Sequence, residues 1–503
     1  MEIMGSIING SDESLSVQRL KLLSLDGDLS RNPSPRTAKG ARTEDGAESK
    51  GRGGELPTDG IIALYRAVRI EMNSEMNQPT TPGHDPYAPL RYRDFRLLEA
   101  GRFIITFGSE MLTFAIGWEL WLRTSSALAL GMVGLVQVMP ILLLSLPGGH
   151  VADQYNRRRI VIITETGLAL CALGLAALSF YQGSLWLVYV CLLGIGVARA
   201  FNDPASSTLL PETIPPELFS RAASWNSSVW QFGSITGPAI GGVIVAVFNR
   251  VDVIYVFDAI AALVFAVLVG QIQGRVLPLA RKAATMDSLK EGIRFMRRTK
   301  VILAAITLDM FAVLFGGAVA LLPIYATDIL RVGPQGLGVM RAAPSIGAII
   351  MAFILAHRPP MKNAGRTLLW AVAGFGLATI AFGLSTTFWL SVAMLVLLGA
   401  LDNISVVIRA TLMLTYAPDE MRGRVSSVNN IFIATSNEMG AFESGLTAAW
   451  FGPVLSVVGG GIGTILVVLS VVRIWPEMRR LKTLDGPEPA GEAVLVDIPS
   501  PEK

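Results

Sequence analysis

The sequence from 149 to 159 reads Gly149-His150-Val151-Ala152-Asp153-Gln154-Tyr155-Asn156-Arg157-Arg158-Arg159. This short charged segment lies between two long apolar ones: residues 127–147 have no charged side chain, and residues 160–180 have one, Glu165. An apolar run of about 20 residues is long enough to cross the hydrocarbon core of a bilayer as a helix. We therefore interpret residues 149–159 as a loop between two membrane-spanning helices. Its arginines place it on the cytoplasmic face, where cations gather.

The composition indicates a polytopic membrane protein. The chain has 503 residues, of which 51% are hydrophobic and 16% are charged, whereas soluble domains contain about 25% charged residues. Its 50 glycines agree, because glycine is commoner in membrane helices than in soluble ones. Cys171 and Cys191 fall inside apolar segments, which favours packing roles over a disulfide. The histidines lack the spacing of a zinc site, and we expect no cofactor, no metal and no nucleic-acid partner.

Twelve apolar segments are long enough to span a bilayer. They are residues 95–122, 127–150, 160–181, 184–205, 219–248, 253–271, 301–326, 336–356, 367–385, 388–411, 425–450 and 453–474. Alternate connections are short and uncharged, while the others carry arginine and lysine. The cationic connections hold Arg157, Arg158, Arg159, Arg221, Arg275, Arg281, Lys282, Arg358, Lys362, Arg366, Arg422 and Arg424. The positive-inside rule therefore puts both termini in the cytoplasm, as an even number of spans also requires.

The domain organisation follows from these spans. Residues 1–90 are rich in Ser, Gly, Pro and charged side chains, which predicts a disordered cytoplasmic tail. Residues 91–272 and 301–475 are each expected to form a six-helix bundle, and residues 476–503 a second cytoplasmic tail. The linker, 273–300, places Leu289, Ile293 and Met296 on one helical face with cations around the rest, which predicts an amphipathic helix on the inner membrane surface. The expected fold class is an all-α polytopic membrane protein with twelve transmembrane helices in two six-helix bundles.

The two halves repeat each other at an offset of 203 residues, as in transporters built from parallel repeats. The offset pairs Pro215 with Pro418, Glu217 with Glu420, Arg221 with Arg424, Asn226 with Asn429, Gly237 with Gly440 and Gly242 with Gly445. A general excess of Gly and Leu in membrane helices does not explain Pro-x-Glu, Arg and Asn in register. The loop that mirrors residues 149–159 keeps Gly365-Arg366 but holds Lys362 at the position of the acid.

The loop at 149–159 resembles the loop between helices 2 and 3 of major facilitator superfamily transporters, which runs Gly-x-Leu-Ala-Asp-Arg-x-Gly-Arg-Lys. It keeps Gly149, Ala152, Asp153, Arg157 and Arg158, and departs at Gln154 and Asn156, where the family prefers a cation and a glycine. The resemblance implies alternating access, with a latch in which Asp153 closes on the start of helix 11 at Arg422 or Arg424. A solvated loop would explain the arginines alone, but not Gly149 and Asp153 at this spacing.

The fifth span contains Gly233-Ser234-Ile235-Thr236-Gly237-Pro238-Ala239-Ile240-Gly241-Gly242. Small residues one turn apart allow close helix packing, and proline bends a helix. The string is similar to the Gly-x-x-x-Gly-Pro-x-x-Gly-Gly element of drug and proton antiporters, in which Gly233, Gly237, Pro238, Gly241 and Gly242 take the motif positions and imply export. Ordinary small-residue packing would explain the glycines, but less readily Gly-Pro followed by Gly-Gly.

Longer stretches resemble one subgroup of the superfamily, that of the enterobactin exporter and related drug and macrolide efflux proteins. The resemblance covers residues 91–480 and is carried by Leu321-Leu322-Pro323-Ile324-Tyr325-Ala326 and Arg422-Gly423-Arg424-Val425, among others. It implies a bacterial cytoplasmic (inner) membrane protein that is powered by the proton gradient.

Ionisable side chains inside membrane spans are energetically costly, so each is a candidate functional residue. A low-dielectric cavity favours the neutral form of a carboxyl, which can then exchange a proton. We expect Glu110 and Glu438 to carry protons or contact substrate, with Asp309 and Arg102 behind them, although each could instead pair with an arginine for packing. The expected structural or cavity charges are Arg199 with Asp203, Asp402 with Arg409, and Arg422 and Arg424.

The sequence therefore predicts a secondary transporter that exports a siderophore or drug-like molecule in exchange for protons, as a monomer in the lipid bilayer. An importer or a lysophospholipid flippase on the same fold is the alternative, and the glycine string of the fifth span argues against it. A membrane-embedded enzyme is a third alternative. The sequence offers no Ser-His-Asp set for it and no Gly-x-x-x-x-Gly-Lys motif for ATP.

Overall fold

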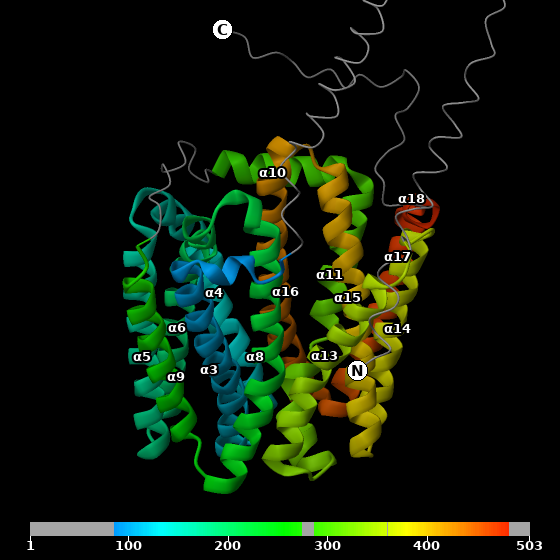
Figure 1. Ribbon diagram of the computed structural model, residues 1–503. Helices are drawn as coiled ribbons and strands as arrows, with labels where there is room; N and C mark the ends of the chain where they lie inside the picture. The colour runs from blue at the N-terminus through cyan, green and yellow to red at the C-terminus, as the bar shows by residue number, and fades with distance from the viewer. Residues whose placement is uncertain (1–84, 274–285, 360, 482–503) are drawn as a thin grey trace, which may run out of the picture. The chain divides into compact units, whose positions relative to one another are not determined.

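The computed structural model describes residues 85–273, 286–359 and 361–481. All regular secondary structure in these residues is helical (Figure 1). The predicted tail 1–90 falls almost entirely outside the described residues, as does most of the tail 476–503. The fold is therefore the packing of the helices between these tails.

The first half of the described region is a bundle of six long helices. They are α3 (Arg93–Thr124), α4 (Ala127–Gln154), α5 (Arg157–Phe180), α6 (Leu185–Ser207), α8 (Phe219–Phe248) and α9 (Asp252–Gly270), with short helices η1 (Ala88–Arg91), α7 (Leu210–Thr213) and η2 (Pro216–Leu218). Helix α3 packs along α8 and α9, α5 packs along α6 and α9, and α4 packs along α6.

The second half is built in the same way. Its helices are α11 (Lys300–Phe315), α13 (Gly333–Ala356), α14 (Ala364–Leu384), α15 (Phe388–Tyr416), α16 (Asp419–Phe451) and α17 (Pro453–Ile474), followed by the short α18 (Pro476–Arg480). Helix α15 packs along α13 and α14, α14 packs along α17, and α11 packs along α16 and α17. The predicted all-α fold with a helical bundle in each half is confirmed.

The helices present apolar side chains outward, as a lipid environment requires. Ile163, Leu170 and Trp186 of the first half are 65–72% exposed, and Trp370 of the second is 77% exposed. Eleven helical segments in the described part of the chain are long and apolar enough to span a membrane. The predicted span 425–450 lies in α16, which is long enough at 33 residues. This helix carries Arg422, Arg424, Glu438 and Glu443, which make it too polar to be counted among the eleven segments.

The predicted span 301–326 lies within Lys300–Ile329, which is long and apolar enough to cross a membrane, but its helix breaks near the middle. Helix α11 ends at Phe315, and after Gly316-Gly317 the chain continues as η3 (Ala318–Leu321), α12 (Leu322–Ile324) and the π-helical η4 (Tyr325–Ile329). Two consecutive glycines weaken a helix. Here they also allow a close approach, since a Cβ on Gly317 would overlap the backbone of Gly440 in α16.

At one end, the two bundles share a single apolar core. Leu112 and Trp118 of α3 lie in the same buried cluster as Leu322 and Tyr325 of the second half. The indole Nε1 of Trp121 donates a hydrogen bond to Thr327 Oγ1 across the seam, at 2.7 Å. Glycine contacts close the seam further: α4 packs against α16 where Gly131 meets Gly445.

At the opposite end, each bundle has its own core. We call it the arginine-rich end, because it carries Arg157, Arg221, Arg422 and Arg424. The clusters there are built from Leu98 and Ile160 in the first bundle, and from Ile302 and Val425 in the second. The bundles are thus packed together at one end and have separate cores at the other.

The predicted amphipathic helix of the linker lies within α10 (Met286–Arg298). Its apolar face packs on the second bundle, where Ile293 and Met296 join Val425 and Val428 of α16. Gly292 lies against the backbone of Arg424. The side chains of residues 286–289, which include the predicted Leu289 position, lie outside the described residues.

Candidate functional site

A cavity of about 500 Å³ lies between the bundles. Helices α3, α4 and α6 line it from the first half, and α11, η3, α13, α15 and α16 from the second. Its charged side chains are Glu110, Arg199, Arg341, Asp402 and Glu438, accompanied by the polar side chains of Ser109, Thr113, Gln137 and Asn437. Cavities of this size accept drug-sized molecules.

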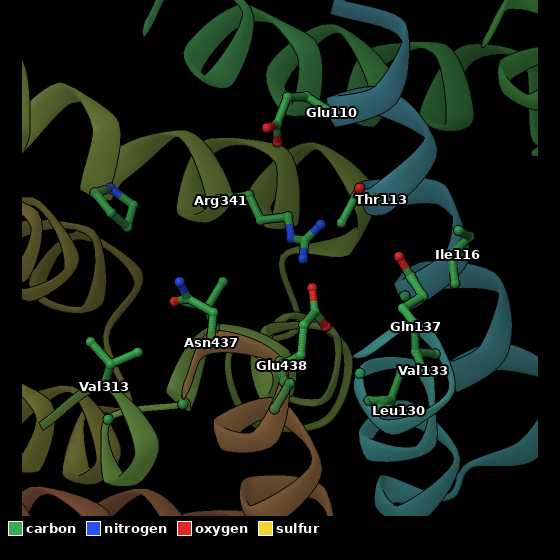
Figure 2. Close-up of a pocket in the computed structure, with 18 of the residues that line it drawn as sticks. Glu110, Thr113, Ile116, Leu130, Val133, Gln137, Val313, Arg341, Asn437 and Glu438 are labelled. Carbon is green, nitrogen blue, oxygen red and sulfur yellow. The ribbon is translucent and has the colours of Figure 1, made fainter. Parts of the chain in front are cut away.

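Two of the predicted carboxyls come together around an arginine. Figure 2 shows Arg341 extending into the space between Glu110 of α3 and Glu438 of α16. Both carboxylates are electrostatic neighbours of this guanidinium. The charged group in the cavity is therefore assembled from helices of both bundles.

Arg341 was not among the residues that sequence reasoning singled out. Its signal was present, because it is an ionisable side chain inside the predicted span 336–356. Arg341 lies on α13, which is positioned by close packing on α8, where Gly338 approaches the carbonyl oxygen of Pro238.

The glycine string of α8 faces two helices. Gly233, Gly237 and Gly241 pack on α3, and a Cβ on Gly237 would lie 2.8 Å from the Cβ of Glu110. Gly242 faces the other bundle, where a Cβ would lie 2.5 Å from the carbonyl oxygen of Pro334. The string thus fixes the position of a cavity carboxyl and also forms part of the seam between bundles.

Arg199 and Asp203 are charged neighbours one turn apart on α6, but Arg199 does not donate its hydrogen bond to Asp203. The guanidinium of Arg199 instead reaches across to α4, where Nη1 donates to Gln137 Oε1 at 3.3 Å, at the cavity wall. The i,i+4 spacing permits a pair but does not require one, because a long arginine side chain can turn toward a neighbouring helix.

The predicted pair Asp402–Arg409 is wrong, because Arg409 pairs with Asp309 of α11. Ser405 Oγ donates to the same Asp309 carboxyl at 3.4 Å. Asp402 lies seven residues from Arg409 on α15 and lines the central cavity instead. Asp309 therefore has a buried ionic partner between two helices of one bundle, and with Asp402 it lines a small pocket beside the central cavity.

Arg102 lies outside the cavity lining and ties three helices together. Its guanidinium donates to Asn226 Oδ1 of α8 and to the carbonyl oxygen of Ser206 at the end of α6, each at 2.7 Å. Glu99 lies 3.6 Å away on the same helix. The predicted substrate or proton role of Arg102 gains no support from this placement.

The loop at 149–159 is mostly helical, because α4 continues to Gln154 and α5 begins at Arg157. Asn156, at a position where the family prefers glycine, caps α5: its Oδ1 accepts from the backbone N–H groups of Arg158 at 3.0 Å and Arg159 at 3.4 Å. Arg157 forms an ion pair with Glu212 at 3.0 Å. These contacts anchor the loop within its own bundle.

The close approach near this loop involves Gly148, one residue before the predicted Gly149. A Cβ on Gly148 would overlap the carbonyl oxygen of Ala200 in α6. Asp153 lies on the last turn of α4, partly exposed. In the second half of the chain, Arg424 pairs with Glu291 of α10, and Arg422 Nε donates to the carbonyl oxygen of Leu414 at 3.2 Å.

Two six-helix bundles around a charged central cavity define a membrane transporter of the major facilitator type. The family described as transmembrane secretion effectors matches residues 84–489, and the chain belongs to this family of the major facilitator superfamily. It is a multi-pass membrane transporter of the major facilitator type, not an enzyme.

Curated relatives agree with this family. The chain is 27% identical over 415 residues to the multidrug efflux pump Tap of Mycolicibacterium fortuitum, covering 79% of this chain and 98% of the relative. It is 24% identical over 392 residues to the enterobactin exporter EntS of Escherichia coli, covering 77% and 93%.

Solved structures share the fold. A bacterial homologue of the human lysosomal transporter Spinster, inward-facing and unoccupied, superposes with a TM-score of 0.59 at 13% identity, over 79% of this chain and 98% of that one. The POT-family transporter PepTSo gives a TM-score of 0.62 at 13% identity, over 78% and 99%. At this identity the likeness concerns the fold alone.

Proposed function

We propose that the protein exports a drug-like or siderophore-type small molecule across the bacterial cytoplasmic membrane in exchange for protons, by alternating access and as a monomer. The observation that carries the proposal is the charged cavity between two bundles that share a core at one end only. The names of the relatives, a multidrug pump and an enterobactin exporter, support the direction of transport.

The packing supports a state that opens toward the cytoplasm. The cores are separate at the arginine-rich end, and cations favour the cytoplasmic face, with both termini of the chain on that side. Rocking of the bundles about the cavity would open the opposite end, where Trp121 and Thr327 hold the seam. The shared core must then separate.

The charges of the cavity suggest which cargo it accepts. Three carboxyl groups, those of Glu110, Asp402 and Glu438, face two guanidiniums, those of Arg199 and Arg341. A carboxylate majority favours a cationic drug-like cargo, and the guanidiniums leave room for a cargo that also carries acidic oxygens.

Glu110 and Glu438 are the proposed carriers of the coupling ion, the proton, which moves in the direction opposite to the exported molecule. In their ionised forms both can pair with Arg341, and a cationic cargo competes with that guanidinium for the same carboxylates. Protonation from outside would neutralise them and release the cargo.

The proposal is tested in an efflux-deficient bacterium that expresses the full chain. Cells are loaded with ethidium, and in a second arm with a catecholate siderophore, and cell-associated cargo is followed with and without a protonophore. We expect faster loss of one cargo than in vector controls, and the protonophore should abolish the difference. Higher accumulation with the protein than without it would support the importer, and an altered lysophospholipid distribution alone would support the flippase.

Replacing Asp153 with asparagine tests the latch. We expect export to fall about tenfold, because a hydrogen bond to a charged partner contributes about 1.5–3 kcal/mol and asparagine retains shape without charge. The latch would form when the arginine-rich end closes and Arg424 exchanges Glu291 for Asp153. Export rate is measured against membrane content of the protein, which should be unchanged.

The matched control for the latch is Asp252→Asn. Asp252 begins α9 at the opposite end and pairs with the half-exposed Arg250. Equal export by wild type and Asp153→Asn would refute the latch.

A further inference from the structure

A second group of buried polar side chains lies inside the first bundle, outside the cavity lining. Glu165 of α5, Asn202 of α6 and Asp258 of α9 are 1%, 8% and 4% exposed. Helix α5 packs along both α6 and α9, which brings the three side chains together. None of the functional roles described above uses them.

The group is short of hydrogen-bond donors. Asn202 Nδ2 donates to Glu165 Oε1 at 2.7 Å. Glu165 Oε2, Asp258 Oδ1 and Asn202 Oδ1 are buried without a hydrogen-bond partner among the described residues. Burying a charge or a polar atom without a hydrogen-bond partner is unfavourable, so these oxygens need a donor.

The surrounding charges limit which ligand or ion could supply the missing hydrogen-bond donor. The charged neighbours of Glu165 are Asp258 of α9 and, from α6, Arg199 and Asp203. Helix α3 presents Gly108 to Asp258, where a Cβ would lie 2.9 Å from Oδ1, and the titratable residues of α4 lie in its last two turns. Three acids thus share one cation, which also faces Glu110 and Glu438 in the cavity.

A metal ion does not suit this group. Among the described residues, no three or more His, Cys, Asp or Glu side chains are arranged to hold one. A proton does suit it, because protonating one carboxyl removes a buried negative charge and supplies the missing donor at once.

We propose that Glu165 and Asp258 form a proton-binding site inside the first bundle, separate from the cargo cavity. Arg199 couples the two sites. When the buried carboxyls lose a proton, their negative charge attracts the guanidinium; when they regain it, the guanidinium is released toward Glu110 and Glu438. The coupling role rests on the proposed export function, whereas proton binding itself does not.

The test is infrared difference spectroscopy of the purified full-length protein in lipid nanodiscs, without cargo. Spectra are recorded between about pH 5 and about pH 9, the range over which a perturbed carboxyl titrates. The wild type should show the carbonyl stretch of protonated carboxyls, and this band should shrink as the pH rises. Glu165→Gln and Asp258→Asn should each lose a part of the titrating band.

The control is Glu119→Gln, since Glu119 belongs to neither site and its carboxyl already accepts hydrogen bonds from Tyr255 at 2.7 Å and Arg123 at 3.1 Å. If both test variants give the same band as this control, the proton site is refuted, whatever the export assay shows. Should the variants fail to accumulate, isotope labelling of aspartate carboxyl carbons in the wild type decides: absence of a shifted, titrating aspartate band refutes the role of Asp258.

Discussion

Replacing Arg341 with methionine is expected to reduce export at least about tenfold. The guanidinium lies between Glu110 and Glu438, so its loss leaves these two carboxyls with Arg199 as their one cation in the cavity lining (Figure 2). A charged partner of this kind contributes about 1.5–3 kcal/mol, which corresponds to a factor of about ten or more in rate. The carboxyls should then hold protons permanently and stop responding to the gradient. Ethidium efflux per unit of membrane protein measures the effect.

Two variants control this prediction. Arg341→Lys keeps the positive charge and should retain part of the activity. Arg250→Met removes a half-exposed arginine at the end of α8 and should leave export unchanged. Wild-type export by Arg341→Met would show that the cavity carboxyls do not depend on this cation, and the account of the cavity would fail.

Replacing Gly445 with valine should also reduce export strongly. A Cβ at Gly445 would lie 2.5 Å from the Cα of Gly131 and 2.7 Å from the carbonyl oxygen of Ala127. Both are backbone atoms of α4, so relieving the overlap requires the helices themselves to move apart. Overpacking of this kind costs about 1–3 kcal/mol. The seam between α4 and α16 should therefore fail to close, and export should fall about tenfold or more.

The distance between spin labels placed on α4 and α16 near this seam measures the effect directly, and should broaden and lengthen in the variant. Gly459→Val is the matched control, because a Cβ at Gly459 would meet no atom within 4 Å. An unchanged distance together with full export would show that the seam tolerates the added side chain.

The helices were predictable because a membrane span has a simple physical signature. Length and apolarity delimit α8 and α17 to the residue, at 219–248 and 453–474. The break at Gly316-Gly317 was not predicted, because a pair of glycines is tolerated in many membrane helices. Its effect here depends on Gly440 of a neighbouring helix.

The members of the site were easier to predict than their partners. Glu110 and Glu438 follow from the cost of charge inside a membrane, and the cavity contains both. Which arginine meets which acid depends on helix rotation and on packing between segments far apart in sequence. Arg409 therefore pairs with Asp309 across α11 and α15, and a spacing rule within one helix could not reveal this.

The central claim is proton-driven export through the Glu110 cavity, and transport in proteoliposomes under an imposed proton gradient tests it most directly. The account predicts that the wild type moves ethidium or a catecholate siderophore only when the gradient is present. Glu110→Gln should still bind cargo but lose the gradient-driven movement. No movement of either cargo by the wild type, with Glu110→Gln behaving identically, would contradict the account.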